Sequence, residues 1–329
     1  MEKKRILFKV EGYKQISVGH IYRCLTIAEL LKEHEVMFVT SKRSREGIDL
    51  LEDSGINYTV IDTLDDIFLL IQKWRPDIII NDCLNSEPEY MKKLKSMVNR
   101  VIAIEDIGEG SAYADAVINA LYNEKGDDQI YFYGEKYHCL RNEFMMLEPK
   151  EFTPSVENII ITFGGADPSN LTKKLYSAVK NVHNFYQNIH FTFVCGFVYD
   201  SERNGILSDP ENNISVLQNI SNISYYMQQS DIAVTSQGSA IFELASLGVP
   251  AIVMAQNKRE QSHTFASLEN GFINLGLGTD VTVDLVQKTL CWLIETPVIR
   301  SEMRSLMLKN DLKKGAERIS KIILNDGGT

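Results

Sequence analysis

Residues 235–250 of the chain read TSQGSAIFELASLGVP. The apolar run at residues 232–235 predicts a strand leading into this stretch, and residues 239–247 predict a largely apolar helix. The closing Gly-Val-Pro separates that helix from a second predicted strand at residues 251–254. Because two strands joined by a crossover helix are the unit of a parallel sheet, the stretch predicts an α/β domain.

The same stretch carries candidate binding residues. Gly238 allows a tight turn, and with Ser239 and Ala240 it presents the amino end of the helix. The free N–H groups and the positive dipole end at that point favour a diphosphate. Glu243 lies one turn further, where its carboxylate can accept hydrogen bonds from the vicinal hydroxyls of a ribose. The alternative, a surface glutamate on an ordinary helix, is disfavoured by the apolar residues around it.

Short apolar strands alternate with helices along most of the chain. Strands are predicted at residues 5–10, 36–40, 58–61, 77–81, 100–104, 115–119, 158–163, 190–195, 214–217, 232–235 and 251–254. Helices are predicted at residues 21–33, 48–54, 65–74, 87–98, 170–182, 223–229, 239–247, 261–270, 283–295 and 297–324. This alternation is typical of parallel sheets covered by helices on both faces.

The length of 329 residues suits two domains of ordinary size. The periodicity weakens between about residues 122 and 154, and we place the linker at residues 148–155. We expect a doubly wound, Rossmann-like domain at residues 1–150 and a second one at residues 151–329, facing a cleft. Ligands should bind beyond the carboxyl ends of the strands. The last helix is long enough to pack back on the first domain.

Composition and charge narrow the classes of function. The net charge of -10 argues against broad nucleic-acid binding, although a local basic pocket for a nucleotide stays compatible with it. No apolar run is long enough to span a bilayer, and the N-terminus lacks a signal peptide, so we expect a cytoplasmic location and no stable membrane insertion. The five widely spaced cysteines include no CxxC pair, which favours reduced thiols over disulfides or a zinc site.

Residues 16–31, ISVGHIYRCLTIAELL, place Gly19 and His20 at the start of a predicted helix. The glycine allows a tight turn, and the helix end favours an anion. Histidine is the side chain most easily poised for proton transfer near neutral pH, and Arg23 follows His20 by three residues. From this motif alone, a catalytic histidine and one that caps the helix or fills a gap are equal alternatives.

A second glycine turn, Gly164-Gly165, follows a predicted strand and leads through Asp167-Pro168 into a helix. This is a phosphate cradle in general form, although it matches neither a Walker A sequence nor GxGxxG. The alternative is a plain turn with a helix cap, for which Asp-Pro is common. Residues 256–261, QNKREQ, form a polar loop at the same end of the sheet. That loop can contact sugar or phosphate, or be an ordinary loop.

In this order and spacing, the motifs resemble the nucleotide-sugar hydrolases of pseudaminic acid biosynthesis, often named PseG or SpsG, within the GT-B superfamily. Residues 18–25, VGHIYRCL, resemble the family's Gly-His-x-x-Arg-Cys-Leu signature, and residues 137–144, YHCLRNEF, its Tyr-x-Leu-Leu-Arg-x-Glu-Phe segment. Residues 163–172, FGGADPSNLT, resemble its Phe-Gly-Gly-x-Asp-Pro-x-Asn-Leu-Thr segment. Residues 238–250 resemble the nucleotide-binding helix of the MurG-like glycosyltransferases as well. The resemblance covers nearly the whole chain.

The resemblance implies hydrolysis of UDP-2,4-diacetamido-2,4,6-trideoxy-β-L-altropyranose, or a close relative, to the free sugar and UDP. It implies that His20 is the general base for water attacking the anomeric carbon, with Asp82 as a second catalytic residue. With the motifs above, it assigns substrate and UDP binding to Gly19, Arg23, Gly164, Gly165, Gly238, Ser239, Ala240, Glu243 and Asn257. It implies no metal and no organic cofactor. We expect a monomer or weak dimer whose partner is a UDP-activated acetamido sugar and not nucleic acid.

Four segments of the first domain depart from the family pattern. Where the family usually has Arg-x-Asp, Gly-x-Gly-His, Asp-x-Tyr and Asp-Asp, this chain has Lys9-Val10-Glu11, Ser17-Val18-Gly19-His20, Asp82-Cys83-Leu84 and Glu105-Asp106. Charge is kept at most of these positions, but side-chain reach is not. Since the resemblance implies that the first domain binds sugar or acceptor, a different acetamido sugar or acceptor is compatible with the pattern. The sequence does not decide whether Asp82, Glu105 or Asp106 assists His20.

Three other classes of function compete with hydrolysis. A GT-B glycosyltransferase would use the same base and UDP site, and a basic, apolar acceptor surface would distinguish it. Residues 42–45, KRSR, are basic but can be a solvated turn. A nucleotide-sugar binding protein without turnover would not need the pair His20 and Arg23. A 2-epimerase normally carries a richer set of acidic and histidine residues than the motifs supply.

Overall fold

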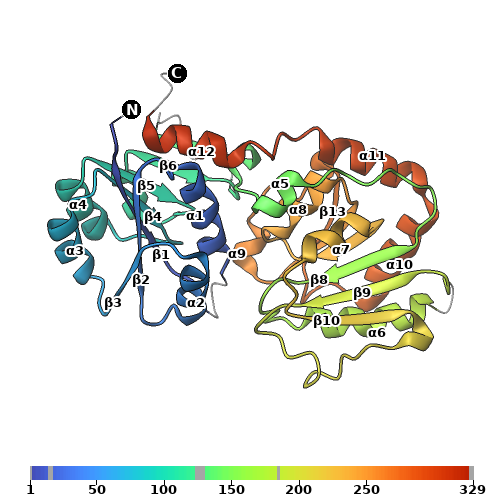
Figure 1. Cartoon of the computed structure of the whole chain (residues 1–329). Helices are drawn as coiled ribbons and strands as arrows, with labels where there is room; N and C mark the ends of the chain where they lie inside the picture. The colour runs from blue at the N-terminus through green and yellow to red at the C-terminus, as the bar shows by residue number, and fades with distance from the viewer. Residues whose placement is uncertain (1, 14–17, 123–129, 184–185, 326–329) are drawn as a thin grey trace. The chain divides into compact units, whose positions relative to one another are not determined.

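The computed structural model of the chain describes residues 2–13, 18–122, 130–183 and 186–325. Ile16 and Ser17 of the first glycine motif lie outside the described residues. The chain divides into two compact units, residues 1–141 together with 312–329, and residues 142–311 (Figure 1). Residues 142–150, which the sequence analysis placed in the first domain, are part of the second unit.

The first unit is built on a parallel sheet with the strand order β3-β2-β1-β4-β5-β6-β7. Its strands are β1 (Arg5–Val10), β2 (Glu35–Ser41), β3 (Tyr58–Ile61), β4 (Ile78–Asp82), β5 (Arg100–Ile104), β6 (Ala116–Asn119) and β7 (Tyr131–Tyr133). Its helices are α1 (Gly19–Leu30), α2 (Arg45–Ser54), α3 (Asp66–Trp74), α4 (Pro88–Met97) and α12 (Gly315–Leu324), with 3-10 turns at Glu109–Tyr113 and Glu135–Tyr137. The strand order reverses between β1 and β4, which is the switch point of a doubly wound sheet.

Alternate side chains of the central strands pack on opposite faces of this sheet. Ile78 and Ile80 share a core with residues of α1 and α12, whereas Leu7 and Ile79 share one with residues of α3 and α4. Figure 1 shows α3 and α4 on one side of the sheet and α1 on the other. Because both faces are covered, the central strands are largely apolar, and Lys9, Asn81 and Asp82 are polar residues near the carboxyl ends of β1 and β4.

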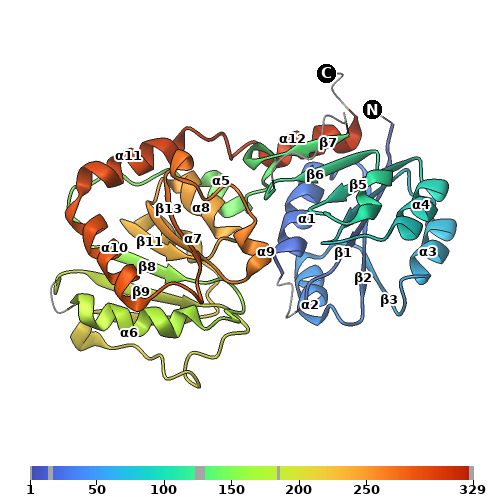
Figure 2. The same cartoon turned by 180° about the vertical axis from the view of Figure 1, so that it is seen from behind.

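The second unit is a parallel sheet with the strand order β10-β9-β8-β11-β12-β13. Its strands are β8 (Asn158–Thr162), β9 (His190–Cys195), β10 (Ile214–Gln218), β11 (Ile232–Thr235), β12 (Ala251–Ala255) and β13 (Phe272–Leu277). Its helices are α5 (Asn142–Met146), α6 (Leu171–His183), α7 (Ile223–Gln229), α8 (Ala240–Leu247), α9 (Lys258–Gln261), α10 (Val283–Glu295) and α11 (Pro297–Leu308), with 3-10 turns at Pro210–Asn212 and Leu268–Asn270. Helix α6 packs with α10, and α8 packs with α7 and α11 (Figure 2).

These two parallel sheets confirm the predicted α/β fold class, but two predicted helices were wrong and two strands were missed. The helix predicted at residues 297–324 is two helices, α11 and α12, and the break between them falls where the chain passes from the second unit to the first. The helix predicted at residues 261–270 is replaced by an irregular segment between α9 and a 3-10 turn. Strands β7 and β13 at two sheet edges were not predicted.

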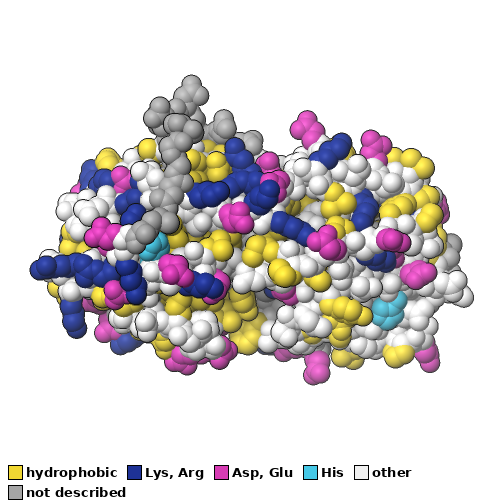
Figure 3. Space-filling model, turned by 45° about the horizontal axis from the view of Figure 1, so that its top comes forward, with side chains coloured by type: hydrophobic (Ala, Val, Ile, Leu, Met, Phe, Trp, Pro, Cys, Tyr) yellow, Lys and Arg dark blue, Asp and Glu magenta, His cyan; other side chains and the backbone are white. Residues whose placement is uncertain are grey.

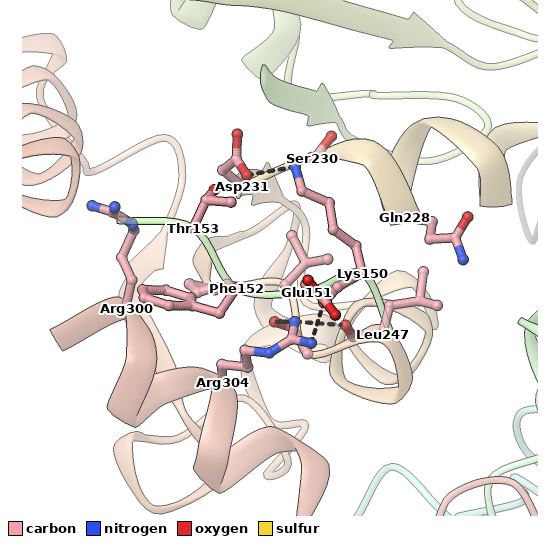
Figure 4. Close-up of a pocket in the computed structure, with 13 residues that line it drawn as sticks. Lys150, Glu151, Phe152, Thr153, Gln228, Ser230, Asp231, Leu247, Arg300 and Arg304 are labelled. Atoms are coloured by element: carbon pink, nitrogen blue, oxygen red, sulfur yellow. Dashed lines mark hydrogen bonds and ion pairs between the residues drawn. The ribbon is translucent and has the colours of Figure 1, made fainter. Parts of the chain in front are cut away.

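Two arginines of α11 donate hydrogen bonds to the segment that precedes β8. Arg300 is fully buried and donates to the carbonyl of Pro154 and to the last carbonyls of α10. Arg304 donates to the carbonyl of Lys150, whose ammonium lies 2.6 Å from Asp231 (Figure 4). The pocket between these residues holds only about 20 Å³ and lies at the amino ends of β11 and β12. Because of this small volume and this position, the pocket is not a candidate ligand site, and the residues around it connect α11 to the segment before β8.

We predict that Gly315→Ala destabilises the first unit by about 1–3 kcal/mol, because a Cβ there would lie 1.8 Å from the carbonyl oxygen of His138. The chain has two tryptophans, Trp74 in α3 and Trp292 in α10, so a Trp292→Phe background makes fluorescence report on the first unit. Urea unfolding in that background measures the loss. Glu317→Ala, on the exposed side of α12, is the control, and equal stability of both variants would contradict the packing described here.

Candidate functional site

The carboxyl ends of the first sheet open onto a cavity of about 760 Å³. Residues at the ends of β1, β2, β3 and β4, together with α1 and α4, line it, and all of them belong to the first unit. Its volume lies in the range of small-molecule sites. Its position at the carboxyl ends of the strands is where doubly wound sheets bind ligands. This cavity is the candidate functional site of the first unit.

His20, the second residue of α1, meets Asp82, the last residue of β4, in this cavity. The distance from His20 Nδ1 to Asp82 Oδ1 is 2.5 Å. The Asp82 side chain is fully buried, whereas His20 is partly exposed. Among the described residues, His20 Nε2 has no hydrogen-bond partner. With its Nδ1 proton held by a carboxylate, the imidazole keeps Nε2 available to accept a proton.

Arg23, one turn further along α1, donates two hydrogen bonds to the same carboxylate. Its Nε donates to Asp82 Oδ2 at 2.8 Å and its Nη2 to Oδ1 at 2.6 Å. Nη2 also lies 2.9 Å from His20 Nδ1. Since one nitrogen cannot both donate to Asp82 and accept from Arg23, we assign the proton to the shorter contact between His20 and Asp82. Arg23 is not among the residues that line the cavity, so here it holds Asp82.

The charges in this cluster compensate one another. Burial alone would raise the pKa of Asp82, but Arg23 and His20 outweigh it and hold that pKa well below its usual range. Burial would likewise lower the pKa of Arg23, but Asp82 and Glu105 raise it. Asp82 is therefore anionic near neutral pH, and it can stabilise the imidazolium that forms when His20 takes up a proton.

Glu105, directly after β5, is a third buried charged group near this cluster. Its Oε1 lies 3.6 Å from Arg23 Nη1 and accepts a hydrogen bond from the Ala120 N–H at 3.1 Å. Burial raises the pKa of Glu105. Its φ of 55° is in the left-handed region, a conformation that residues other than glycine adopt at some cost. Glu105 does not line the cavity, so of the three acids considered beside His20, only Asp82 touches its ring.

Gly19 is the first residue of α1, and the preceding Val18 offers no side-chain cap to the helix. A Cβ added at Gly19 would meet no atom within 4 Å. The packing of the described residues therefore does not require a glycine at this position.

In the second unit, Gly238 and Ser239 directly precede α8, which begins at Ala240 at the carboxyl end of β11. Ser239 occupies the N-cap position but makes no side-chain capping hydrogen bond. The N–H groups of Ile241 and Phe242 donate to the carbonyls of Gly238 and Ser239, so an anion at the amino end of α8 would meet the N–H groups of Ser239 and Ala240 and the helix dipole. Glu243 lies in the first turn of α8 and is buried.

The other glycine turn of the second unit has the geometry of a turn with a helix cap. The Asp167 carboxylate accepts hydrogen bonds from the N–H groups of Leu171 and Thr172, at 2.9 and 2.7 Å, and so caps α6. Gly164 has a φ of 75°, which suits glycine. Ligand binding by Gly164 and Gly165 stays a prediction.

Asn257 is the N-cap of α9, and its Oδ1 accepts from the N–H of Glu260 at 3.0 Å. The neighbouring Gln256 donates to the carbonyl of Phe163 at 2.9 Å, which joins this loop to the Gly164 turn. Asn257 and the two glycine turns thus lie at the carboxyl ends of the second sheet. A contact of Asn257 with a ligand stays a prediction.

Sequence reasoning missed several polar residues of the first cavity. Lys9, Glu11, Asn81 and Tyr90 line it together with His20. Lys9 and Glu11 entered the sequence analysis only as departures from a motif. The available signal was a lysine and an asparagine inside the apolar runs RILFKV and IIIND, where a parallel strand normally has none.

The described residues place two further limits on the site. They contain no group of three or more His, Cys, Asp and Glu side chains arranged to hold a metal ion. None of their helices has both the length and the apolar character needed to cross a membrane. On the face drawn in Figure 3, Lys and Arg side chains are interspersed with Asp and Glu, so charges of one sign do not gather there.

Comparison with solved structures defines the class of fold. Acinetobacter baumannii MurG superposes with a TM-score of 0.72 at 14% identity, covering 98% of this chain and all of that one. A Neisseria meningitidis UDP-GlcNAc 2-epimerase, bound to UDP-GlcNAc, superposes with a TM-score of 0.67 at 12% identity, covering 98% and 100%. The protein has a GT-B fold of two Rossmann-like units.

The sequence matches point to one domain type within that class. Residues 159–318 match the model of the glycosyltransferase family 28 C-terminal domain. The Bacillus subtilis spore coat polysaccharide biosynthesis protein SpsG is 26% identical over 83% of both chains. An uncharacterized Methanocaldococcus jannaschii protein, MJ1062, is 30% identical over 78% of this chain, which spans 57% of that relative's length.

We predict that Asp82→Asn destabilises the first unit by about 3–5 kcal/mol near neutral pH, because it leaves the buried Arg23 without its main counter-charge. The pKa of Asp82 is lowered on folding, so its contribution is complete above the ordinary aspartate value of about 3.9. That contribution is lost as the pH falls below this value. The stability gap between wild type and variant should therefore narrow as the pH falls below about 4.

Urea unfolding at a series of pH values, again followed by Trp74 in a Trp292→Phe background, measures this gap. Asp53→Asn, on an exposed position of α2, is the control. A gap that does not narrow below about pH 4 would show that Asp82 is not held in its charged form.

Proposed function

We propose that this protein is a nucleotide-sugar enzyme that hydrolyses a UDP-linked acetamido sugar to the free sugar and UDP. The observation that carries the proposal is the contact of His20 with Asp82 in the cavity of the first unit. A histidine held by a buried carboxylate, with one ring nitrogen unoccupied, has the arrangement of a general base. The resemblance to the PseG and SpsG hydrolases supports the choice of substrate.

In the proposed reaction, the Nε2 atom of His20 takes a proton from water while the water oxygen forms a bond to the anomeric carbon. The bond between that carbon and the β-phosphate oxygen breaks, and its electron pair leaves with UDP. Asp82 stabilises the imidazolium and keeps the ring in place through Nδ1. Arg23 keeps Asp82 in place. The proton on His20 then returns to solvent.

The second unit is proposed to bind UDP. The uncapped amino end of α8 offers N–H groups and a positive dipole end to the departing diphosphate, whose negative charge grows as the bond breaks. Buried Glu243 is placed to accept hydrogen bonds from the ribose hydroxyls. The match to a glycosyltransferase domain and the UDP-GlcNAc in a protein of the same fold support this assignment.

Glycosyl transfer is the second candidate function, favoured by the match to the glycosyltransferase family 28 C-terminal domain. The same base would then take the proton of an acceptor hydroxyl instead of water. The two reactions therefore differ in the nucleophile that His20 would deprotonate, which is water in hydrolysis and an acceptor hydroxyl in transfer.

Release of UDP from a panel of UDP-acetamido sugars, with no acceptor added, distinguishes these candidates. Turnover at enzyme-like rates establishes a hydrolase, and the best substrate names the sugar. Tight binding of UDP without release contradicts hydrolysis and favours transfer to an acceptor.

We predict that His20→Ala lowers kcat by about 10²–10⁴-fold and leaves the Kd for UDP unchanged, because the base acts on water and not on the nucleotide. Steady-state UDP release and titration calorimetry measure the two quantities. His190→Ala in β9 is the control for loss of a histidine. Parallel loss of turnover and UDP affinity would indicate a structural role for His20.

We predict that Glu243→Ala weakens UDP binding by about 10-fold or more, which corresponds to one or two hydrogen bonds to a charged acceptor, and slows saturated turnover less. Calorimetry with UDP and kcat at saturating substrate make the comparison. Glu269→Ala, an exposed glutamate of the same unit, is the control. An unchanged Kd would remove Glu243 from the nucleotide site.

A further inference from the structure

The cavity of the first unit also contains an ion pair that the proposed mechanism does not use. Lys9 of β1 and Glu11, which directly follows β1, both line the cavity. By the two-residue period of a strand, Lys9 shares the face of Leu7, which α3 and α4 cover. Asp82, which contacts His20, belongs to the opposite face, where α1 packs. The cavity therefore reaches over the sheet edge, from His20 to the pair of Lys9 and Glu11.

Lys9 is a buried cation with unused hydrogen-bonding capacity. Its side chain is only 9% exposed, and its Nζ atom lies 3.6 Å from Oε1 of Glu11. This distance is longer than a hydrogen bond. Within the described residues, the three ammonium donors therefore have no hydrogen-bond acceptor. Because a buried donor without an acceptor costs free energy, a ligand group that accepts from Lys9 is favoured.

The other ionisable groups near Lys9 are engaged elsewhere. Asp82 is held by α1, and Asp106 accepts hydrogen bonds from two backbone N–H groups through Oδ1, each at 2.9 Å. Burial raises the pKa of the Cys83 thiol to about 12, so this neighbour of Lys9 stays uncharged near neutral pH. In the part of the chain that the structure describes, Glu11 is therefore the counter-charge of Lys9.

Glu11 is fixed through one carboxylate oxygen and open at the other. Its side chain is 8% exposed, and its Oε2 accepts a hydrogen bond from the Ser41 hydroxyl at 2.7 Å. Its Oε1 faces Lys9 at 3.6 Å, and no donor among the described residues bonds to it. Glu11 thus presents a positioned acceptor next to the free donors of Lys9.

The gap between Lys9 and Glu11 fits a single atom that both accepts and donates a hydrogen bond. An oxygen about 2.8 Å from each of Nζ and Oε1 spans this gap of 3.6 Å. A hydroxyl oxygen has the donor and the lone pairs for both bonds, whereas an ether oxygen lacks the donor. An amide carries its donor and its acceptor on two atoms that point in opposite directions, so it does not fit. A second charged group would face a like charge on one side of the gap.

We propose that Lys9 and Glu11 form a hydroxyl subsite, which binds one unsubstituted ring hydroxyl of the sugar and so determines which sugars are accepted. The hydroxyl oxygen accepts a hydrogen bond from Lys9 Nζ and donates one to Glu11 Oε1. This inference rests on the proposed function, because it places the sugar in the cavity beside His20. In UDP-2,4-diacetamido-2,4,6-trideoxy-β-L-altropyranose, O3 is the only unsubstituted ring hydroxyl, so O3 is the expected occupant.

The test compares ligands that differ in this one hydroxyl. The first set is UDP-2,4-diacetamido-2,4,6-trideoxy-β-L-altropyranose with its 3-deoxy and 3-O-methyl analogues. The second set is UDP-N-acetylglucosamine with its 3-deoxy and 4-deoxy analogues, and UDP alone is the reference. Titration calorimetry gives Kd, and UDP release gives kcat/KM, for each ligand.

Full-length wild type is compared with Lys9→Met, Glu11→Leu and the variant that carries both substitutions. The double substitution replaces a buried ion pair by apolar side chains of similar volume, which is often neutral for stability, whereas a single one leaves a lone buried charge. The double variant therefore stays informative if a single variant fails to fold. Lys92→Met, at an exposed position of α4, is the matched control.

We expect wild type to bind the hydroxyl ligand about 10–100-fold more tightly than its deoxy analogue, as hydrogen bonds to charged groups imply. The double variant should bind both alike, and the Kd for UDP should not change, since the subsite lies in the first unit. Structural damage would weaken binding of both ligands and leave their ratio intact.

Two results overturn the inference. One is a double variant that keeps the wild-type ratio of the two Kd values. The other is a wild type that binds every deoxy analogue as tightly as its parent, because water would then complete the pair of Lys9 and Glu11. This second comparison needs no variant, so it holds even if the variants fail to fold.

The outcome separates this inference from the proposed function. If wild type releases UDP but does not distinguish the hydroxyl ligands from their deoxy analogues, hydrolysis stands and the subsite is contradicted. If wild type releases no UDP but distinguishes them in Kd, and the double variant does not, the subsite stands and hydrolysis is contradicted. A wild type that binds none of the UDP-sugars contradicts both.

Discussion

An ionised carboxylate can be buried in a protein only if cations and hydrogen-bond donors surround it. Asp82 has no exposed surface and sits at the switch point of the first sheet, so α1 must supply its partners. Arg23 gives it two hydrogen bonds, His20 a third, and the Cys24 thiol lies 3.3 Å from Oδ2. A shift of α1 along the sheet would break all of these contacts together. The position of α1 and the orientation of the His20 ring therefore follow from one electrostatic requirement.

Much of this fold could be predicted because local sequence and global fold agree in the sheet centres. Runs such as Ile78–Asp82 and Asn158–Thr162 are apolar because they are covered on both faces, and their lengths distinguish them from helices. The strands at the sheet edges were harder to predict. Strand β13, FINLGL, alternates weakly and contains a glycine, so its pairing with β12 depends on tertiary contact. The break before α12 was missed although Asn310, Asp311 and Gly315 are weak helix formers, because the apolar residues on either side continue a helical pattern; the chain passes from one unit to the other after Asp311.

The candidate site, like the fold, was predicted only in part from the sequence. His20 and Arg23 could be found because a helix repeats every three to four residues and carries both on one segment. Their partner Asp82 is far away in sequence, and only the order of β1 and β4 brings it to them. Lys9 and Asn81 illustrate the limit more sharply. Each looks like an isolated polar residue in an apolar strand, and only parallel register makes them neighbours.

The choice between water and an acceptor follows from what fills the first cavity. The proposed base, His20, would not by itself select water, since a general base can take a proton from any hydroxyl placed beside it. A cavity of about 760 Å³ is larger than one sugar ring needs, so space for an acceptor exists unless the sugar's own substituents occupy it. Under the proposed function, sugar substituents that fill the side of the cavity away from His20 would leave water as the nucleophile that still fits, so the type of reaction would follow from the shape of the cavity.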